Sequence, residues 1–491
     1  MRVSSWRAAL EGPGLSWSPY QLESAAARFA GVLRARGSTV LATLMDNGPA
    51  WIVADLAASR AGVVHVPLPA FFTPEQVRHA LAAAGVDTLL TTPQGAAAWP
   101  QGASAQCAVA EQPLVLLGLP GARVPMPPGT AKITFTSGST AAPKGVCLDA
   151  NAMRRAAAGL VTALEPLDIR RHLCVLPLAV LLENLAGVLA PLARGATVVV
   201  PPLAEVGLSG SSGFDPATFD AAVRRHEPDS LILLPQMLRA WTAWLQYAGR
   251  RASASLRMVA VGGAAVGEPL LLAARERGIP AHEGYGLSEG ASVQTLNLPG
   301  QDRPGSAGRP LPHARLRIAG DGEIEMAGTL MAGYLGDGAP VPQWWPTGDL
   351  GRIDEDGFLH VEGRKKNVLI TGFGRNVSPE WVETALRGDP RIAQAVVFGD
   401  GQQALSAVLW PLAAGVPDQA LAGAVEAANA TLPDYARVGR WVRARAAFDA
   451  QARLATPNGR PLRGAILALH ADALGLPASP SASKEPHDFL P

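Results

Sequence analysis

The stretch Ile133–Val146 reads ITFTSGSTAAPKGV. It starts with a strand-like apolar alternation, Ile133 and Phe135, and continues into small and hydroxyl-bearing residues that end at Lys144. Small residues let backbone N–H groups approach an anion closely, hydroxyls add donors, and a lysine adds positive charge. The stretch therefore predicts a loop that holds a nucleotide polyphosphate, although a solvated loop has the same composition. The candidate ligands are Thr136, Ser137, Gly138, Ser139, Thr140 and Lys144.

This loop is not of the Walker type, because no Gly-Lys-Ser/Thr tripeptide follows at the required spacing. It resembles the phosphate loop of the adenylate-forming superfamily, which includes acyl-CoA synthetases, luciferases and peptide-synthetase adenylation domains. The family pattern is close to T-S-G-S-T-G-x-P-K-G, and Ala141 is the one departure from it. The resemblance implies ATP as a substrate, with Lys144 among the catalytic residues.

Three further motifs follow in the family's order. Val261–Ala264 reads VGGA, and the matching family segment contacts adenine; a plain tight turn is the alternative. In Tyr285–Glu289, YGLSE, the resemblance implies that the aromatic ring stacks on adenine and that the carboxylate binds Mg²⁺ through oxygen. Thr347–Asp349 reads TGD, whose carboxylate would accept both ribose hydroxyls, although an Asp-capped turn explains the triplet as well. The implied nucleotide-binding residues are Gly262, Gly263, Ala264, Tyr285, Gly286, Ser288 and Asp349, and Glu289 is implied as a catalytic and metal-binding residue.

The C-terminal part of the chain carries the remaining motifs of the resemblance. Arg364 matches an arginine that approaches the ribose, and Lys366 matches a hinge position. The turn with Gly372, Gly374 and Arg375 resembles one that contacts coenzyme A. Arg460 stands where the family has a catalytic lysine. An arginine keeps the charge, but its planar fork is less compact, so the exchange is not conservative at a tight site.

Leu176–Glu183 resembles the family's L-P-L-x-H-x-x-E, and the resemblance places Val180 and Glu183 at the acyl site. Val180 stands where an aromatic residue or histidine is usual, which favours an apolar acyl group. The surrounding stretch Leu173–Leu192 is apolar, but Pro177 and Glu183 are among the residues that interrupt it. We therefore predict a buried strand and a core helix rather than a transmembrane segment.

Composition excludes several classes of function. The 491 residues carry a net charge of +1 and no long basic cluster, which argues against a nucleic-acid partner. The three cysteines are far apart and the histidines lack metal-ligand spacing, which predicts a reducing, cytoplasmic setting and no protein-ligated zinc or iron. No signal peptide is expected. Lysines are scarce: Lys132, Lys144, Lys365, Lys366 and Lys484 are the complete set.

Strand and helix patterns alternate along most of the chain, as in Tyr20–Arg36, Val40–Leu44 and Cys174–Leu176. This alternation predicts an α/β fold with parallel sheets flanked by helices. We expect an N-terminal domain over 1–363, with a small β-rich subdomain at about 305–363. A mobile α+β C-terminal domain over 364–476 and a disordered tail over 477–491 would follow it.

The most direct interpretation is an acid:thiol ligase that uses ATP and Mg²⁺ to activate a medium- or long-chain fatty or other apolar acid. The acyl-AMP would then react with coenzyme A. One alternative is an acyl-AMP ligase that loads a carrier protein, or a related β-lactone-forming enzyme. Another is a nucleotide- or acyl-binding pseudoenzyme. The sequence leaves the acid's identity and the oligomeric state open.

Overall fold

The computed structural model describes residues 8–99, 104–136, 144–210, 213–372, 375–456 and 459–477. The chain divides into two compact units, Met1–Val361 and Glu362–Pro491. The first unit contains two large mixed sheets, parallel at the centre and antiparallel towards the edges, with helices on both faces, and the second unit has its own small sheet. This arrangement confirms the predicted α/β class.

Two large sheets organise the first unit. The nine-stranded sheet has the order β18 (Arg309–Pro310), β17 (Ser292–Leu296), β16 (Ala281–Leu287), β15 (Met258–Val261), β14 (Ser230–Leu233), β10 (Arg171–Leu173), β11 (Thr197–Val199), β1 (Leu10–Gly12) and β2 (Leu15–Trp17). The eight-stranded sheet has the order β21 (Gly333–Tyr334), β9 (Lys144–Asp149), β8 (Thr130–Thr136), β4 (Val64–Pro67), β3 (Val40–Leu44), β5 (Thr88–Thr91), β7 (Gln112–Gly118) and β6 (Ser104–Val109).

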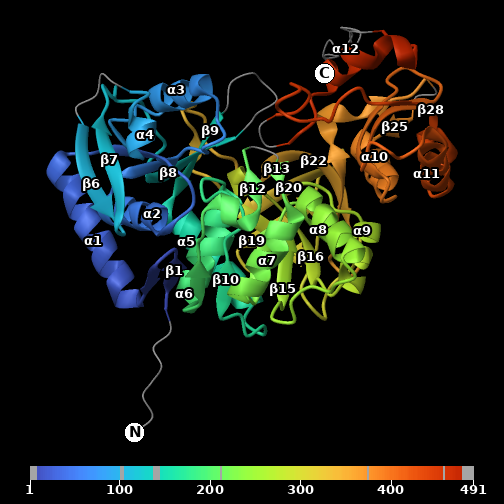
Figure 1. Cartoon of the computed structure of the whole chain (residues 1–491). Coiled ribbons are helices and arrows are strands. Elements are labelled where there is room, and N and C mark those ends of the chain that lie inside the picture. The colour runs from blue at the N-terminus through green and yellow to red at the C-terminus, as the bar shows by residue number, and fades with distance from the viewer. Residues whose placement is uncertain are drawn as a thin grey trace. The chain divides into compact units, whose positions relative to one another are not determined.

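Helices cover both faces of these sheets (Figure 1). Apolar residues of α1 (Pro19–Arg36) and α2 (Pro49–Ala61) form one core with both sheets, so these helices lie between them. A second core between the sheets includes α5 (Ala150–Ala163). The outer faces are covered by α3 (Pro74–Ala83) and α4 (Pro93–Ala96) on one side, and by α7 (Pro216–His226), α8 (Pro235–Tyr247) and α9 (Glu268–Glu276) on the other. The result is a five-layered arrangement.

Local signals fix the helix ends where the sequence indicates them. At the start of α1 the Ser18 hydroxyl accepts a hydrogen bond from the Gln21 backbone, and the Gln21 side chain accepts one from the Ser18 backbone at 2.9 Å. This reciprocal capping box satisfies two backbone donors that the helix itself cannot pair. The helix ends at Gly37, whose φ of 72° suits glycine.

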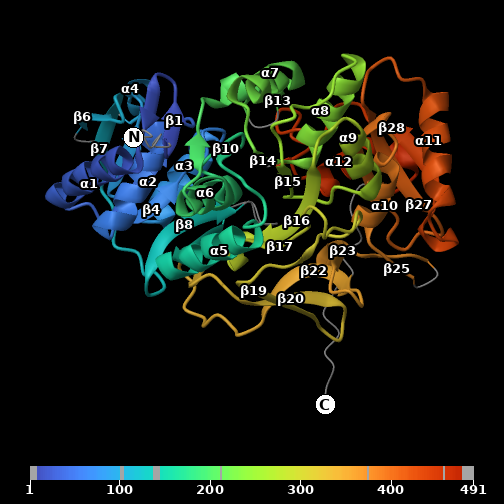
Figure 2. The same ribbon diagram turned by 90° about the horizontal axis from the view of Figure 1, so that it is seen from below.

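The first unit also contains a smaller sheet, which Figure 2 shows from below. Its strands are β19 (Ala314–Ile318), β20 (Glu323–Gly328), β22 (Trp345–Ile353) and β23 (Leu359–Arg364). The second unit contains β24 (Leu369–Ile370), β25 (Asn376–Val377), β26 (Ile392–Phe398), β27 (Leu405–Pro411) and β28 (Val438–Arg443), with α10 (Pro379–Arg387), α11 (Asp418–Ala430) and α12 (Arg463–Leu474). Residues 478–491 of the predicted tail lie outside the described residues.

The strand predicted at Cys174–Leu176 is wrong, because β10 ends at Leu173. The Cys174 N–H still donates to the Val199 carbonyl of β11 at 2.9 Å, but the backbone groups of Leu176 and Leu178 bond to side chains. Asn47 donates from Nδ2 to the carbonyl of Leu176 at 2.8 Å, and its Oδ1 accepts from the Leu178 N–H at 2.8 Å. The Leu176 N–H donates to Glu183 at 3.2 Å. The helix that follows starts as a π-helix, η1 (Glu183–Leu189), and continues as α6 (Ala190–Arg194).

No helix in the described part of the chain combines the length and the hydropathy that a bilayer crossing requires.

A buried charge network joins five elements of the first unit. Asp55 of α2 forms an ion pair with Lys132 of β8 at 2.7 Å and contacts His65 of β4 at 2.6 Å. Asn184 of η1 donates to the second Asp55 oxygen at 2.9 Å, and His65 contacts Thr43 of β3 at 2.9 Å. Burial alone would raise the Asp55 pKa, but Lys132 and then His65 hold this pKa well below its usual range.

We expect Lys132→Met to lower the free energy of unfolding by about 3–5 kcal/mol, because it leaves the Asp55 carboxylate buried without its cation. Denaturant titration followed by circular dichroism measures this loss. Arg60→Met is the matched control, since Arg60 pairs with Glu23 on the surface, where such a pair contributes about 0–1 kcal/mol. Equal losses in the two variants would contradict a special role for the buried pair.

Candidate active site

The hairpin of β8 and β9 carries the predicted phosphate loop. The two strands pair antiparallel, with Thr136 opposite Lys144. Thr136 is half-buried, whereas Lys144 is exposed at the start of β9. Lys144 Nζ lies 5.4 Å from the ring centroid of Tyr334. Ser137, Gly138, Ser139 and Thr140 lie outside the described residues, so the structure places only the two ends of the loop.

The glycine-rich segment follows β15 at the edge beside β16. A Cβ on Gly262 would lie 3.1 Å from the carbonyl oxygen of Gly284, so the two backbones approach closely. Gly263 has a φ of 84°, and Gly263 and Ala264 are exposed. Glycine at these positions leaves a flat backbone surface that a planar ring can cover.

Glu283 holds this segment in place, and no sequence motif had indicated it. The side chain lies on β16 opposite Val261 and accepts a hydrogen bond from the Val266 N–H at 3.0 Å. Burial raises the Glu283 pKa to about 7. The signal that could have identified it is the position of an acidic residue in an otherwise buried parallel strand.

Tyr285 and Asp349 meet although 64 positions separate them. The Tyr285 hydroxyl donates to Asp349 Oδ2 at 2.8 Å. Asp349 is buried on β22, and its backbone N–H donates to the Thr347 hydroxyl at 3.1 Å. The TGD triplet therefore lies within a strand, rather than in the isolated Asp-capped turn that is its alternative interpretation. Next to Tyr285, position 286 requires glycine, since a Cβ there would lie 1.8 Å from the carbonyl oxygen of Ser292.

Glu289 and Ser288 lie in a short 3₁₀ turn directly after β16, and both are half-buried. The Tyr334 hydroxyl donates to Glu289 Oε1 at 2.8 Å. Among the described residues no hydrogen bond is made to Glu289 Oε2. A carboxylate with one oxygen available is a hard donor that suits Mg²⁺, which usually takes one or two protein carboxylates together with substrate phosphates. The residues present therefore fit a magnesium ion.

The two residues expected at the acyl site differ in exposure. Val180 is half-buried, whereas Glu183 is fully buried. The Glu183 carboxylate accepts from Leu176 and lies 3.4 Å from His172 Nε2. These contacts give Glu183 a role in holding the backbone that precedes Val180.

The side chains of His172, Cys174 and Glu183 come within 4.8 Å of one another, close enough to consider a metal ion. Their packing argues against one. Burial raises the Cys174 pKa well above its usual range, so the sulfur stays a thiol and donates to the Gly187 carbonyl at 3.6 Å. A Cβ on Gly187 would lie 2.3 Å from Glu183 Oε1, so the cluster is packed closely against the helix. We assign these residues to core packing.

The second unit contains the basic residues singled out from the sequence. Burial lowers the Lys366 pKa, and the neighbouring charges of Arg364 and Arg460 lower it further. Lys366 and Arg460 are both exposed, and the Arg460 backbone N–H donates to the Thr456 hydroxyl at 3.1 Å. Within this unit the hinge candidate and the catalytic candidate therefore belong to one cationic cluster.

Gly372 and Arg375, the described ends of the turn expected to contact coenzyme A, are also exposed. The Gly372 N–H donates to the Gln402 carbonyl at 2.8 Å, and the Arg375 N–H donates to the Thr371 hydroxyl at 3.2 Å. These bonds hold the backbone at the two ends of the turn, and Phe373 and Gly374 lie outside the described residues.

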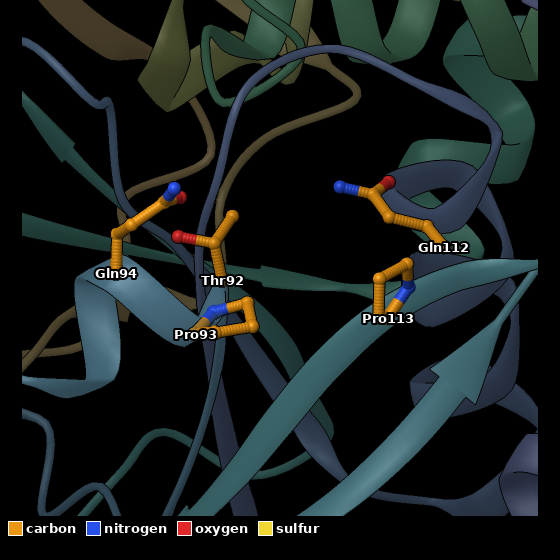
Figure 3. A pocket seen from close by; sticks show the side chains of 5 residues that line it. All are labelled: Thr92, Pro93, Gln94, Gln112 and Pro113. Atoms are coloured by element: carbon orange, nitrogen blue, oxygen red, sulfur yellow. The ribbon is translucent and has the colours of Figure 1, made fainter.

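A hollow of about 610 Å³ opens elsewhere, between the start of α4 and the start of β7 (Figure 3). Its lining residues are Thr92, Pro93, Gln94, Gln112 and Pro113. None of them belongs to a motif, and they include no charged side chain, so the hollow does not compete with the site above.

Comparison of the sequence with protein-family models identifies the family of this chain. The family model described as AMP-binding enzyme matches residues 3–335. The chain belongs to the AMP-binding enzyme family. A model of the AMP-binding enzyme C-terminal domain matches residues 366–474. As a member of this family, the protein is an AMP-forming ligase.

Individual relatives of this AMP-binding enzyme differ in how much of the chain they match. Indoleacetate–CoA ligase of Aromatoleum aromaticum is 31% identical over 450 residues, which cover 81% of this chain and 85% of that protein. A long-chain-fatty-acid–CoA ligase of Mycobacterium bovis is 39% identical over 159 residues, which cover 31% and 26%. The solved structure of O-succinylbenzoate coenzyme A synthetase from Bacillus subtilis, in complex with ATP and magnesium ion, has a TM-score of 0.70 and 25% identity. That match covers 90% of this chain and 97% of the other.

We expect Lys144→Ala, Glu289→Ala and Asp349→Ala each to lower acid-dependent AMP formation by about 10²- to 10³-fold. Each variant removes a group that is expected to contact the same nucleotide, either at its phosphates, through its metal ion or at its ribose. Radiolabelled AMP measures the rate, and circular dichroism checks the fold. Glu426→Ala, an exposed position on α11, is the control. AMP formation close to the wild-type rate in all three variants would contradict the assignment of the nucleotide site.

Proposed function

We propose that the protein is an ATP- and Mg²⁺-dependent acid–CoA ligase that acts on an apolar carboxylic acid. The observation that supports this most directly is the arrangement of Lys144, Glu289 and Asp349 in one unit, where two tyrosine hydroxyls join elements of three sheets. The same proposal is supported by the CoA ligases that the chain resembles over most of its length.

In the first step a carboxylate oxygen of the acid attacks the α-phosphorus of ATP. A new P–O bond forms, the bond between the α-phosphorus and the bridging oxygen breaks, and pyrophosphate leaves. Lys144 and the loop N–H groups would bind the polyphosphate, and Asp349 would accept hydrogen bonds from the ribose. A magnesium ion, when bound by Glu289, would supply compensating positive charge at the phosphates. Such chemistry depends on positioning and charge stabilisation rather than on a protein nucleophile.

In the second step the sulfur of coenzyme A attacks the acyl carbon of the acyl-AMP. The C–S bond forms, the C–O bond to phosphate breaks, AMP leaves, and the thiol proton goes to solvent. Gly372, Gly374 and Arg375 are the residues that we propose for coenzyme A. A guanidinium suits a phosphate of that substrate because its planar fork can bind two oxygens.

Two acid classes have separate support. Indoleacetate–CoA ligase, which spans most of the chain, favours an aryl acid, whereas the shorter match to a fatty-acid–CoA ligase favours the fatty acid that we expected from the sequence. Val180 is compatible with both, since either acid presents an apolar body. We propose an arylalkyl or aryl acid as the first candidate and a medium- or long-chain fatty acid as the second.

The decisive experiment incubates the enzyme with ATP, Mg²⁺ and one acid at a time, from arylacetic and cinnamic acids to C8–C16 fatty acids, with and without coenzyme A. We expect AMP release that depends on the acid, and a matching acyl-CoA detected by mass spectrometry. Glu289→Ala is the control for contaminating activity. Acyl-AMP without acyl-CoA across the panel would favour the carrier-protein or β-lactone alternative, and no AMP with any acid would favour a pseudoenzyme.

We also propose that residues 1–363 and 364–476 act as separate domains, with Lys366 as the hinge between two poses. Lys366→Pro should lower thioester formation more than acyl-AMP formation, because proline fixes φ near −65° and only the second step needs the other pose. Single-turnover assays of the two steps measure this difference, with the adjacent Lys365→Ala as the control. Equal loss of both steps would contradict a rotating domain.

Arg460 is the proposed counterpart of the family's catalytic lysine. Arg460→Ala should lower acyl-AMP formation by on the order of 10²-fold, since a charge-stabilising contact is lost. Arg460→Lys should equal or exceed the wild-type rate, because a compact ammonium suits a tight site. Arg445→Ala, an exposed position in the same unit, is the control. A fully active Arg460→Ala enzyme would exclude Arg460 from this step.

A further inference from the structure

Tyr334 lies on β21, a strand of two residues that no motif had singled out. Its backbone pairs antiparallel with β9, with Tyr334 opposite Val146 and Gly333 opposite Cys147. The flanking bonds Ala332 N–H to Cys147 O and Leu335 N–H to Gly145 O are both 2.8 Å long. β21 is therefore fixed to the strand that starts at Lys144.

The same short segment also holds Glu289, which follows a strand of the other large sheet. The Met331 N–H donates to the Glu289 carbonyl at 2.7 Å, and the Tyr334 hydroxyl donates to Glu289 Oε1 at 2.8 Å. Glu289 is thus bound at its backbone and at its side chain by residues only three positions apart. A carboxylate bound at both points has few orientations available, and the oxygen that Tyr334 does not contact is Oε2.

The ring of Tyr334 has contacts of its own. Lys144 Nζ lies over it at 5.4 Å from the centroid, a cation–π distance. Trp345 of β22 packs edge-on at a centroid distance of 5.8 Å and an angle of 67°. Burial and the adjacent Glu289 charge raise the Tyr334 pKa above its usual range. The phenol therefore remains a hydrogen-bond donor at neutral pH and is unsuited to act as a base.

We propose that Tyr334 is a positioning residue for the metal and phosphate part of the nucleotide site. Its hydroxyl fixes one oxygen of Glu289, which would leave Oε2 to bind a magnesium ion, and its ring holds the Lys144 ammonium in place before ATP enters. The proposal rests on the proposed function for the roles of Glu289 and Lys144. When ATP binds, the Lys144 ammonium can donate charge-assisted hydrogen bonds to a phosphate while the ring keeps it in place.

Tyr334→Phe tests the hydroxyl, because it keeps the ring against Lys144 and Trp345. We expect the Mg²⁺ concentration for half-maximal AMP formation to rise by on the order of 10-fold, as for loss of a hydrogen bond to a charged group. The KM for the acid should stay unchanged. Tyr247→Phe is the matched control, since its side chain is 91% exposed.

A binding measurement supplies a readout that does not need turnover. Electron paramagnetic resonance titration with Mn²⁺ and ATP should show weaker metal binding to Tyr334→Phe, while calorimetry without metal should show unchanged ATP affinity. Tyr334→Leu, which also removes the ring, should weaken metal-free ATP binding as well. In a Glu289→Gln background, Tyr334→Phe should have no further effect on metal binding, because the two changes act through one carboxylate.

Different results would overturn the proposed function and the positioning role of Tyr334. Wild-type protein that binds metal and ATP but forms no AMP with any acid would overturn the proposed function and leave the Mn²⁺ titration of Tyr334→Phe as the test of positioning. Metal binding by Tyr334→Phe equal to that of the wild type, or a loss that is the same with and without Glu289, would overturn the positioning role.

Discussion

The ion pair between Asp55 and Lys132 is the constraint on which the first unit depends. Removing two charges from water costs several kcal/mol per ion unless the charges pair closely and complete their hydrogen bonds. Here that condition requires α2, β3, β4, β8 and η1 to meet in one arrangement. Four residues after Lys132 the same strand ends at Thr136, where the predicted phosphate loop begins. Because the cost of burial offsets most of the attraction, the pair adds little net stability, although removing one partner is costly. Its main effect is to specify how these five elements pack together.

The candidate site forms where elements from three sheets meet, and tyrosine hydroxyls bridge them. A phenol suits this task because its ring packs with apolar neighbours while its hydroxyl reaches a carboxylate. The chain has five tyrosines, of which Tyr285 and Tyr334 donate to Asp349 and Glu289. The other three are at least 40% exposed. The chain thus places its internally bonded phenols at the two carboxylates expected to contact nucleotide and metal.

The sequence was sufficient where one local pattern determines the structure. Val40–Leu44 and Met258–Val261 are short runs rich in apolar residues, and both are parallel strands with the predicted bounds. It was insufficient at Cys174–Leu176, where side chains of Asn47 and Glu183 bind the backbone that a strand would have used. Tyr334 could not be predicted either, because β21 has two residues and its partner Glu289 lies 45 positions earlier. The motif order predicts which residues belong to the candidate site, and long-range packing determines how the described ones are held.

The burial of Lys132 has a practical consequence for protein chemistry. Its side chain is 3% exposed, so amine-selective reagents such as succinimidyl esters should modify it only after unfolding. The other described lysines are Lys144, at one end of the predicted phosphate loop, and Lys365 and Lys366, near the start of the second unit. A peptide map of such labelling would therefore separate three events in one experiment: occupancy of the proposed phosphate site, rearrangement at the proposed hinge, and loss of the native core.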